Sequence, residues 1–257
     1  MSYSNPDFVD RLSRLSTALP IKGRQLIQYF PLLFIGLLIG IKAASRRAYW
    51  VLIAMEDGPV EYLTSVAYLA AAMLCILMIV RLYNKQALGI TALMIGLMAA
   101  LFFFVGMEEI SWGQRIFSIQ SPDFFEVHNY QQEITLHNMI AGSLLHLMYI
   151  VAGLYGAFAW KLFPKKLSDR FPKVSQFIIP DRLLQGYFLP AALLYIYYDY
   201  VSVFLIEVIG LESFRWDRPY GWIISRDQEP VEMLMSLGVM FFVCILFNRQ
   251  THGRLLE

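Results

Sequence analysis

The feature that most constrains this chain is a set of six long apolar runs. They lie at about 26–44, 60–82, 88–107, 138–162, 186–208 and 230–248. A helix of roughly 20 residues, rising 1.5 Å per residue, spans the hydrocarbon core of a bilayer. Only 16% of the residues are charged and 58% are hydrophobic, which is too little charge for the surface of a soluble domain. The sequence therefore predicts an all-α, polytopic membrane helical bundle of about six transmembrane helices, with one transmembrane domain over 26–248.

Composition also excludes several classes of protein. The net charge of +1 comes without a basic stripe, so we expect the lipid bilayer and not nucleic acid as a partner. Cys75 and Cys244 both lie inside apolar runs, which argues against a disulfide framework or a Cys-based zinc site. No HExxH, P-loop, Gly-x-Ser-x-Gly or dinucleotide motif is present. The first apolar run lacks a signal-peptide cleavage pattern and is expected to remain as a helix.

The distribution of lysine and arginine predicts the orientation of the bundle. With a cytoplasmic N-terminus, 14 of the 21 basic residues lie on the inner side, although Lys42, Arg46 and Arg47 in the first outer loop oppose the rule. Both termini are then cytoplasmic, with 249–257 as a tail. Residues 1–25 have helical apolar spacing and predict an amphipathic segment on the inner leaflet, with a plain cytosolic tail as the alternative. In this orientation 14 of the 20 acidic residues lie outside.

Two of the predicted spans open on similar strings. Pro59–Ser65 (PVEYLTS) and Pro230–Ser236 (PVEMLMS) match at five of seven positions, which two short strings cannot establish as a duplication. A proline followed two residues later by a glutamate is also an ordinary helix start. Because further acids surround both starts, we keep a substrate-binding role open for Glu61 and Glu232 beside this structural interpretation.

The outer end of the third span carries an unfavourable pair of charges. Glu108 and Glu109 lie at a helix C-terminus, where the helix dipole disfavours carboxylates. Arg115, a metal ion or a bound cation could compensate. We therefore predict that Glu108 and Glu109 are catalytic, and that Trp112, Gln114 and Arg115 bind substrate.

The outer loop over 108–137 supplies another acid and histidine pair. Glu133 and His137 stand four residues apart and would share a helical face if the fourth helix began early, so that the acid orients the imidazole. Such pairs are also common on solvated helices. We predict a catalytic role for His137 and substrate binding for Glu133. With Glu109 they are the candidate ligands if the unknown cofactor is a divalent metal.

Two ionisable residues lie deeper in the predicted spans. His146 and Asp199 each lie nine residues from an outer helix end, or roughly 14 Å below the boundary. Ionisable groups at such depth face the bundle interior or a wet cavity. We predict that His146 and Asp199 meet as catalytic residues below the glutamates. The alternative is a hydrogen bond between Asp199 and a tyrosine.

Two pairs of strings resemble known families. Glu109–Phe117 (EISWGQRIF) and Glu133–Asn138 (EITLHN) resemble an uncharacterised family of bacterial multi-pass membrane proteins, which implies a bacterial inner-membrane location and no particular activity. Glu108-Glu109 and the Phe124–His128 string are similar to the first two motifs of the CAAX-type (Abi) intramembrane proteases. Here, however, Arg115 follows Glu109 by six residues instead of four, and the third motif is missing.

Three functions fit these patterns. The first is a membrane enzyme acting at the outer leaflet on a lipid-linked or amphipathic substrate, with one of Glu108 and Glu109 as base and His137 or His146 as proton carrier. The second is a proton- or cation-coupled transporter or channel that uses His146 and Asp199 as a relay. The third is a non-catalytic subunit whose outer loop binds a partner membrane protein. We rank them in this order.

Overall fold

The computed structural model describes residues 21–129, 131–217 and 221–251 as helices joined by loops, with no strand in these ranges. Six helical segments of this part of the chain are long and apolar enough to cross a membrane. They are Gly23–Ala44, Arg46–Asn84, Ile90–Glu109, Gly142–Leu162, Val174–Val208 and Ser225–Thr251. The predicted all-helical architecture and the number of apolar spans are therefore confirmed.

Six long elements form the body of the molecule. They are α2 (Ile21–Ala44), α4 (Pro59–Asn84), α5 (Ile90–Glu109), α7 (Gly142–Leu162), α10 (Gln185–Ile196) and α11 (Gln228–Thr251). The fifth span continues from α10 into two π-helical turns, η6 (Tyr197–Val201) and η7 (Phe204–Val208). Short helices complete the connections: α3 (Arg46–Tyr49), η2 (Trp50–Ala54), η3 (Ser111–Gly113), α6 (Asp123–His128), η4 (His137–Met139), α8 (Lys165–Arg170), α9 (Pro172–Ile178), η5 (Arg182–Leu184), η8 (Glu212–Phe214) and η9 (Ser225–Asp227).

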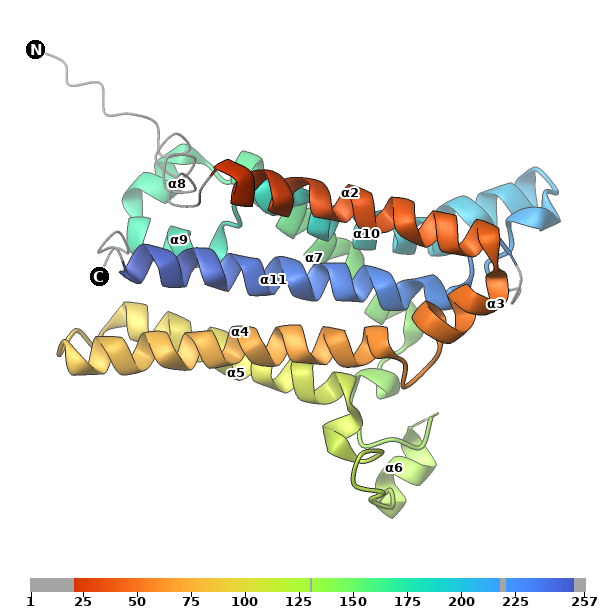
Figure 1. Cartoon of the computed structure of the whole chain (residues 1–257), viewed down its shortest axis with the longest axis horizontal. Coiled ribbons are helices and arrows are strands. Elements are labelled where there is room, and N and C mark those ends of the chain that lie inside the picture. Colours follow the sequence, from red (N-terminus) through yellow and green to blue (C-terminus); the bar gives the residue numbers. More distant parts are fainter. Residues whose placement is uncertain (1–20, 130, 218–220, 252–257) are drawn as a thin grey trace, which may run out of the picture.

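The long helices pack in a fixed order. Helix α4 packs against α5 and α11, and α10 packs against α7 and α11, so that α11 lies at the centre. Helix α2 lies beside α10 and η5 (Figure 1). One end of the bundle, here the pocket end, carries α3 and α6, whereas the opposite end carries α8 and α9 together with the start of α2 and the end of α11 (Figure 1).

Glycines allow a close contact between α7 and α10. A Cβ atom on Gly156 would lie 2.3 Å from Cγ of Phe188, and one on Gly153 would lie 2.7 Å from the backbone nitrogen of Ala192. Small residues that let two backbones approach are typical of helix packing in membranes. They hold α7 and α10 together, and these helices later supply the histidine and tyrosine side of the pocket.

Below the pocket end the bundle is filled by apolar side chains. Leu82, Ile95, Leu234 and Val243 are all fully buried between the helices. On the outer surface, by contrast, leucines such as Leu32 of α2 are exposed over 69% of their area. This distribution, with apolar side chains inside and outside, suits a bundle surrounded by lipid.

Several predicted boundaries require correction or lie outside the described residues. The fourth helix begins at Gly142 and not at 138, because residues 131–141 form a loop with the single turn η4. The predicted amphipathic segment 1–25 lies outside the described ranges except for 21–25, which belong to α2. Of the predicted tail 249–257, residues 249–251 form the end of α11 and the others lie outside the described ranges.

Candidate functional site

The site begins where α5 ends in a left-handed turn. Ser111, Trp112 and Gly113 have φ angles of 47°, 54° and 79°, a region that only glycine adopts without cost. Side chains stabilise this turn, because the Trp112 indole donates to Oε1 of Glu108 at 2.7 Å and the Ser111 hydroxyl donates to Oε2 of Glu133 at 2.6 Å. Strain held by surrounding contacts is common at functional sites. Here it turns the chain sharply out of α5 and into the outer loop.

Glu108 organises the outer loop. Its Oε2 atom accepts hydrogen bonds from the backbone N–H groups of Leu136 at 2.7 Å and His137 at 3.0 Å, and lies 3.3 Å from Nδ1 of His137. These donors, with the Trp112 indole, compensate the carboxylate at the helix end. Arg115, one of the three alternatives considered for this compensation, forms no ion pair with Glu108 in the described chain. With its three donors and an exposed fraction of 5%, Glu108 is a structural anchor.

Arg115 instead ties three segments of the pocket end together. It forms ion pairs with Asp57 and with Glu133, and its Nη2 atom lies 3.9 Å from Oε1 of Glu56. Because Glu133 faces Arg115 and Ser111 while His137 faces Glu108, Glu133 and His137 do not form the predicted pair on one helical face. The fourth helix begins after both residues, which is why the expected spacing does not apply.

Gln114 also holds the outer loop. Its side-chain amide donates to Ser121 at 2.6 Å, and its oxygen accepts from the backbone of Ile134 at 2.7 Å. Trp112, Gln114 and Arg115 were all expected to bind substrate. None of them is among the residues that line the pocket, and all three contact the loop or its neighbours.

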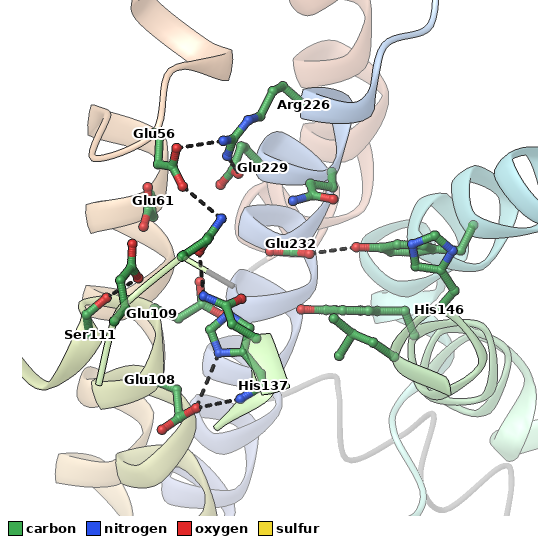
Figure 2. A pocket seen from close by; sticks show the side chains of 17 residues that line it. Glu56, Glu61, Glu108, Glu109, Ser111, His137, His146, Arg226, Glu229 and Glu232 are labelled. Atoms are coloured by element: carbon green, nitrogen blue, oxygen red, sulfur yellow. Dashed lines mark hydrogen bonds and ion pairs between the residues drawn. The ribbon is translucent and has the colours of Figure 1, made fainter. Parts of the chain in front are cut away.

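A pocket that is open at its mouth lies between this loop and the helices (Figure 2). It is lined by Glu56, Glu61, Glu108, Glu109, Ser111, Gln131, Glu133, His137, Asn138, Leu145, His146, Tyr149, Tyr195, Arg226, Gln228, Glu229 and Glu232. Seven glutamates therefore face one arginine and two histidines. The two similar helix starts converge here, because Glu61 of α4 and Glu232 of α11 both line the pocket.

The glutamates of α11 and η2–α4 have partners within the chain. Arg226 donates to Glu229 at 3.2 Å and to Glu56 at 2.7 Å (Figure 2). The hydroxyl of Tyr195 donates to Oε1 of Glu232 at 2.7 Å. Oε2 of Glu61 accepts from the backbone N–H of Asp57 at 2.6 Å, as in an ordinary helix start. The capping interpretation of Glu61 is thus supported, although the same carboxylate also lines the pocket.

Glu109 differs from these residues. Within the described ranges no hydrogen-bond donor, lysine or arginine pairs with its side chain, and the carboxylates of Glu232, Glu229 and Glu61 act on it electrostatically. A carboxylate in such a setting is favourable only when a proton, or a cation from outside the chain, accompanies it. The partnerless carboxylate of the pocket is therefore that of Glu109.

His146 and Asp199 form the opposite wall. Nδ1 of His146 lies 2.7 Å from Oδ1 of Asp199, and the His146 ring lies 4.8 Å from that of Tyr195. The predicted meeting of these residues is confirmed, whereas no tyrosine of the described ranges forms the alternative hydrogen bond to Asp199. Because α7 begins at Gly142, His146 lies in its second turn and is shallower than expected. His146 lines the pocket, and Asp199 supports it from behind.

The predicted metal ligands do not form a metal centre. Among the described residues, no three His, Cys, Asp or Glu side chains are grouped so that they could hold a metal ion. Of the three candidates, Glu133 pairs with Arg115 and Ser111, His137 faces Glu108, and Glu109 is left without either.

Some lining residues were not predicted, although helical spacing could have indicated two of them. Tyr149 follows His146 by three residues on α7, and Arg226 precedes Glu229 by three residues at the start of α11. Residues three apart share a helical face. Leu145 and Gln228 carry no comparable signal.

The fold and the site together define an all-helical protein with six helices able to span a membrane and an acidic pocket at one end of the bundle. No protein-family model, curated protein or solved structure matches the chain. Its function must therefore be argued from the pocket.

Proposed function

We propose that the chain is a multi-pass protein of the bacterial inner membrane, with its pocket end facing outward and its termini in the cytoplasm. The basic residues of the opposite end, such as Arg81, Lys161 and Arg182, support this orientation. Alkaline phosphatase fused after Phe117 should be active, and the same enzyme fused after Lys85 inactive. The reverse pattern would overturn the orientation.

We further propose that this membrane protein is an enzyme that performs acid–base chemistry on the polar part of a lipid-linked or amphipathic substrate. One observation carries the proposal: the unpaired Glu109 and the Asp199-supported His146 line the same pocket. A carboxylate free to exchange a proton and an imidazole fixed by a second acid are the components of general acid–base catalysis. Glu109 acts as the base and His146 as the proton carrier, because Glu108 and His137 are engaged with each other.

The lining supports a particular kind of substrate. Seven glutamates against one arginine favour a group that carries a positive charge or several hydrogen-bond donors. Glu232, held by Tyr195, would bind that group beside Glu109. A pocket at the end of a membrane bundle lies at the level of lipid headgroups, which favours a substrate whose apolar part remains in the bilayer.

The packing beneath the pocket supports an enzyme over an open conduit. Between α4, α10 and α11 most of the buried side chains are apolar, as Cys75, Leu234 and Leu246 illustrate, and the buried Ser236 hydroxyl donates to the backbone oxygen of Met233 in its own helix. An ion or proton pathway would need polar groups or water through this layer. The pocket is therefore best explained as a chamber entered and left from one side.

The test compares lipid extracts of cells that produce the native chain, Glu109→Gln or Glu126→Gln. Glu126 is an exposed residue of α6 away from the pocket lining, so its variant is the matched control. Mass spectrometry of the extracts should show one class of amphipathic compound altered by the native chain and by Glu126→Gln, but not by Glu109→Gln. Equal size-exclusion profiles confirm folding. An unchanged effect in Glu109→Gln would remove the proposal.

Cation- or proton-coupled transport is the second candidate, since an unpaired Glu109 also suits a transient cation. Reconstituted liposomes should then show a flux that falls in Asp199→Asn. A flux indifferent to this change counts against transport. Co-purification of a stoichiometric partner membrane protein, with Glu109 and Glu232 dispensable for it, would instead favour a non-catalytic subunit.

A further inference from the structure

A second hollow at the pocket end gathers the basic residues that oppose the charge rule for membrane orientation. This hollow, here called the basic pocket, is open at its mouth. Its lining consists of Lys42, Arg46, Arg47, Tyr49, Trp50, Gly221 and Ile224. It lies between the end of α2, the α3–η2 turn and the segment before η9. Among the described residues, three cations and no carboxylate line it.

The cations differ in what they contact. Nζ of Lys42 lies 2.8 Å from Oδ2 of Asp227, so that its charge is matched by the chain. The guanidinium of Arg46 lies 5.8 Å from the centre of the Trp222 ring. Arg47 is exposed and has no ion pair with any residue of the described ranges. Arg47 therefore keeps a positive charge in the lining that no described residue neutralises.

Helix geometry alone does not account for these arginines. Lys42 already lies in the last turn of α2, where one cation satisfies the negative end of the helix dipole. Arg46 and Arg47 belong instead to α3, after Ser45 has ended α2 and capped the next turn through the backbone N–H of Ala48 at 3.1 Å. They are additional to the requirements of capping.

The basic pocket also lies at the depth of lipid headgroups. Helix α2 has 24 residues, or roughly 36 Å at 1.5 Å per residue, which exceeds a hydrocarbon core of about 30 Å. Its last turn and α3 therefore reach the interface. Trp50 and Trp222 are exposed over 40% and 65% of their areas beside the arginines, as is typical of residues at the boundary between acyl chains and headgroups.

We propose that the basic pocket binds the phosphate of an anionic phospholipid. Arg47 and Arg46 donate to the phosphate oxygens, and Trp50 and Trp222 contact the region between headgroup and acyl chain. The site is distinct from the acidic pocket and requires only the proposed membrane insertion. It gives a function to Arg46 and Arg47, whose place on the outer side opposes the charge rule for membrane orientation.

Native mass spectrometry of the delipidated full-length chain tests the proposal, with phosphatidylglycerol and phosphatidylcholine as probes. We expect tighter binding of phosphatidylglycerol, weakened about 30-fold in the double variant Arg46→Gln/Arg47→Gln. The double variant Lys161→Gln/Arg170→Gln, with its exposed cations at the opposite end, is the matched control and should bind like the native chain. Phosphatidylcholine bound equally well, or the same loss in the control, would overturn the proposal.

Two further measurements test whether the ligand is free phosphate and whether the chain is inserted in the membrane at all. Inorganic phosphate that displaces the lipid at an equal concentration would show a site for free phosphate and overturn the lipid assignment. Membrane fractionation is done in parallel: recovery of the chain in the soluble fraction would refute membrane insertion, on which this site depends. Membrane-bound chain without lipid selectivity would refute only the basic pocket.

Discussion

Nδ1 of His146 lies 2.7 Å from Oδ1 of Asp199, which joins the second turn of α7 to the π-helical turn η6. An imidazole nitrogen that faces a carboxylate carries the proton, so that the other nitrogen is free to accept one from the pocket. We therefore predict the Nδ1-protonated tautomer for His146 in the native chain. Nitrogen-15 NMR of labelled histidine should show it, and Asp199→Leu should abolish the preference.

His128 supplies the internal control for this measurement. Its Nδ1 lies 2.9 Å from the backbone oxygen of Phe124 and does not depend on Asp199. Its signals should be the same in both proteins. A His146 tautomer that persists in Asp199→Leu would show that Asp199 does not orient the ring.

Substitution by glutamine should have different effects on stability at the adjacent residues Glu108 and Glu109. In Glu108→Gln an amide replaces an oxygen that accepts from Trp112 or from the backbone of Leu136 and His137, so we expect a loss of about 2 kcal/mol in the free energy of unfolding. Glu109→Gln removes a carboxylate that lies among other carboxylates and should leave stability unchanged or raised. Denaturant titration in micelles measures both.

Hydrogen exchange locates the Glu108 effect. The amide protons of Leu136 and His137 should exchange faster in Glu108→Gln and at the native rate in Glu109→Gln. Equal destabilisation by the two substitutions would contradict the assignment of Glu108 as the residue that holds the outer loop.

The contact between α7 and α10 predicts a steric effect. Gly156→Ala places a Cβ atom 2.3 Å from Cγ of Phe188, which forces the helices apart and should cost about 3 kcal/mol. A Cβ atom on Gly36 of α2 would meet no heavy atom within 4 Å, so Gly36→Ala should be neutral or stabilising by about 0.5 kcal/mol. Thermal unfolding of the two variants compares them directly. A native melting temperature in Gly156→Ala would mean that the helices can separate without cost.

The sequence was sufficient for the helices because their signal is local. An apolar run of about 20 residues has few alternatives to a membrane helix, so all six spans were predicted. The start of the fourth was placed four residues early, since the apolar residues before Gly142 belong to a loop whose conformation is set by contacts with Glu108.

The site was predictable only where charge was anomalous. Glu109 and His146 were predicted because ionisable groups at a helix C-terminus or within an apolar span are costly. Glu232 was predicted because further acids surround its helix start. The structural roles of Trp112 and Gln114 in the outer loop were not predicted, because the turn after α5 has left-handed φ angles at residues other than glycine. No sequence rule marks Ser111 or Trp112 for that conformation, and the direction of the following loop depends on it.

The ion pair between Lys42 and Asp227 should stabilise the pocket end. It joins α2 to η9, with side chains exposed by only 9% and 13%, and Asp227 also accepts from the hydroxyl of Tyr49 and from the backbone of Ile224. Lys42→Met leaves Asp227 buried beside neutral donors alone, and we expect a loss of about 3 kcal/mol in the free energy of unfolding. In the double variant Lys42→Met/Asp227→Asn, the amide oxygen still accepts from Ile224, so the loss should be smaller than the sum of the two single losses by at least about 1 kcal/mol. Lys161→Met, an exposed control on α7, should change stability by less than about 0.5 kcal/mol, and additive losses in the double variant would show that the pair is not coupled.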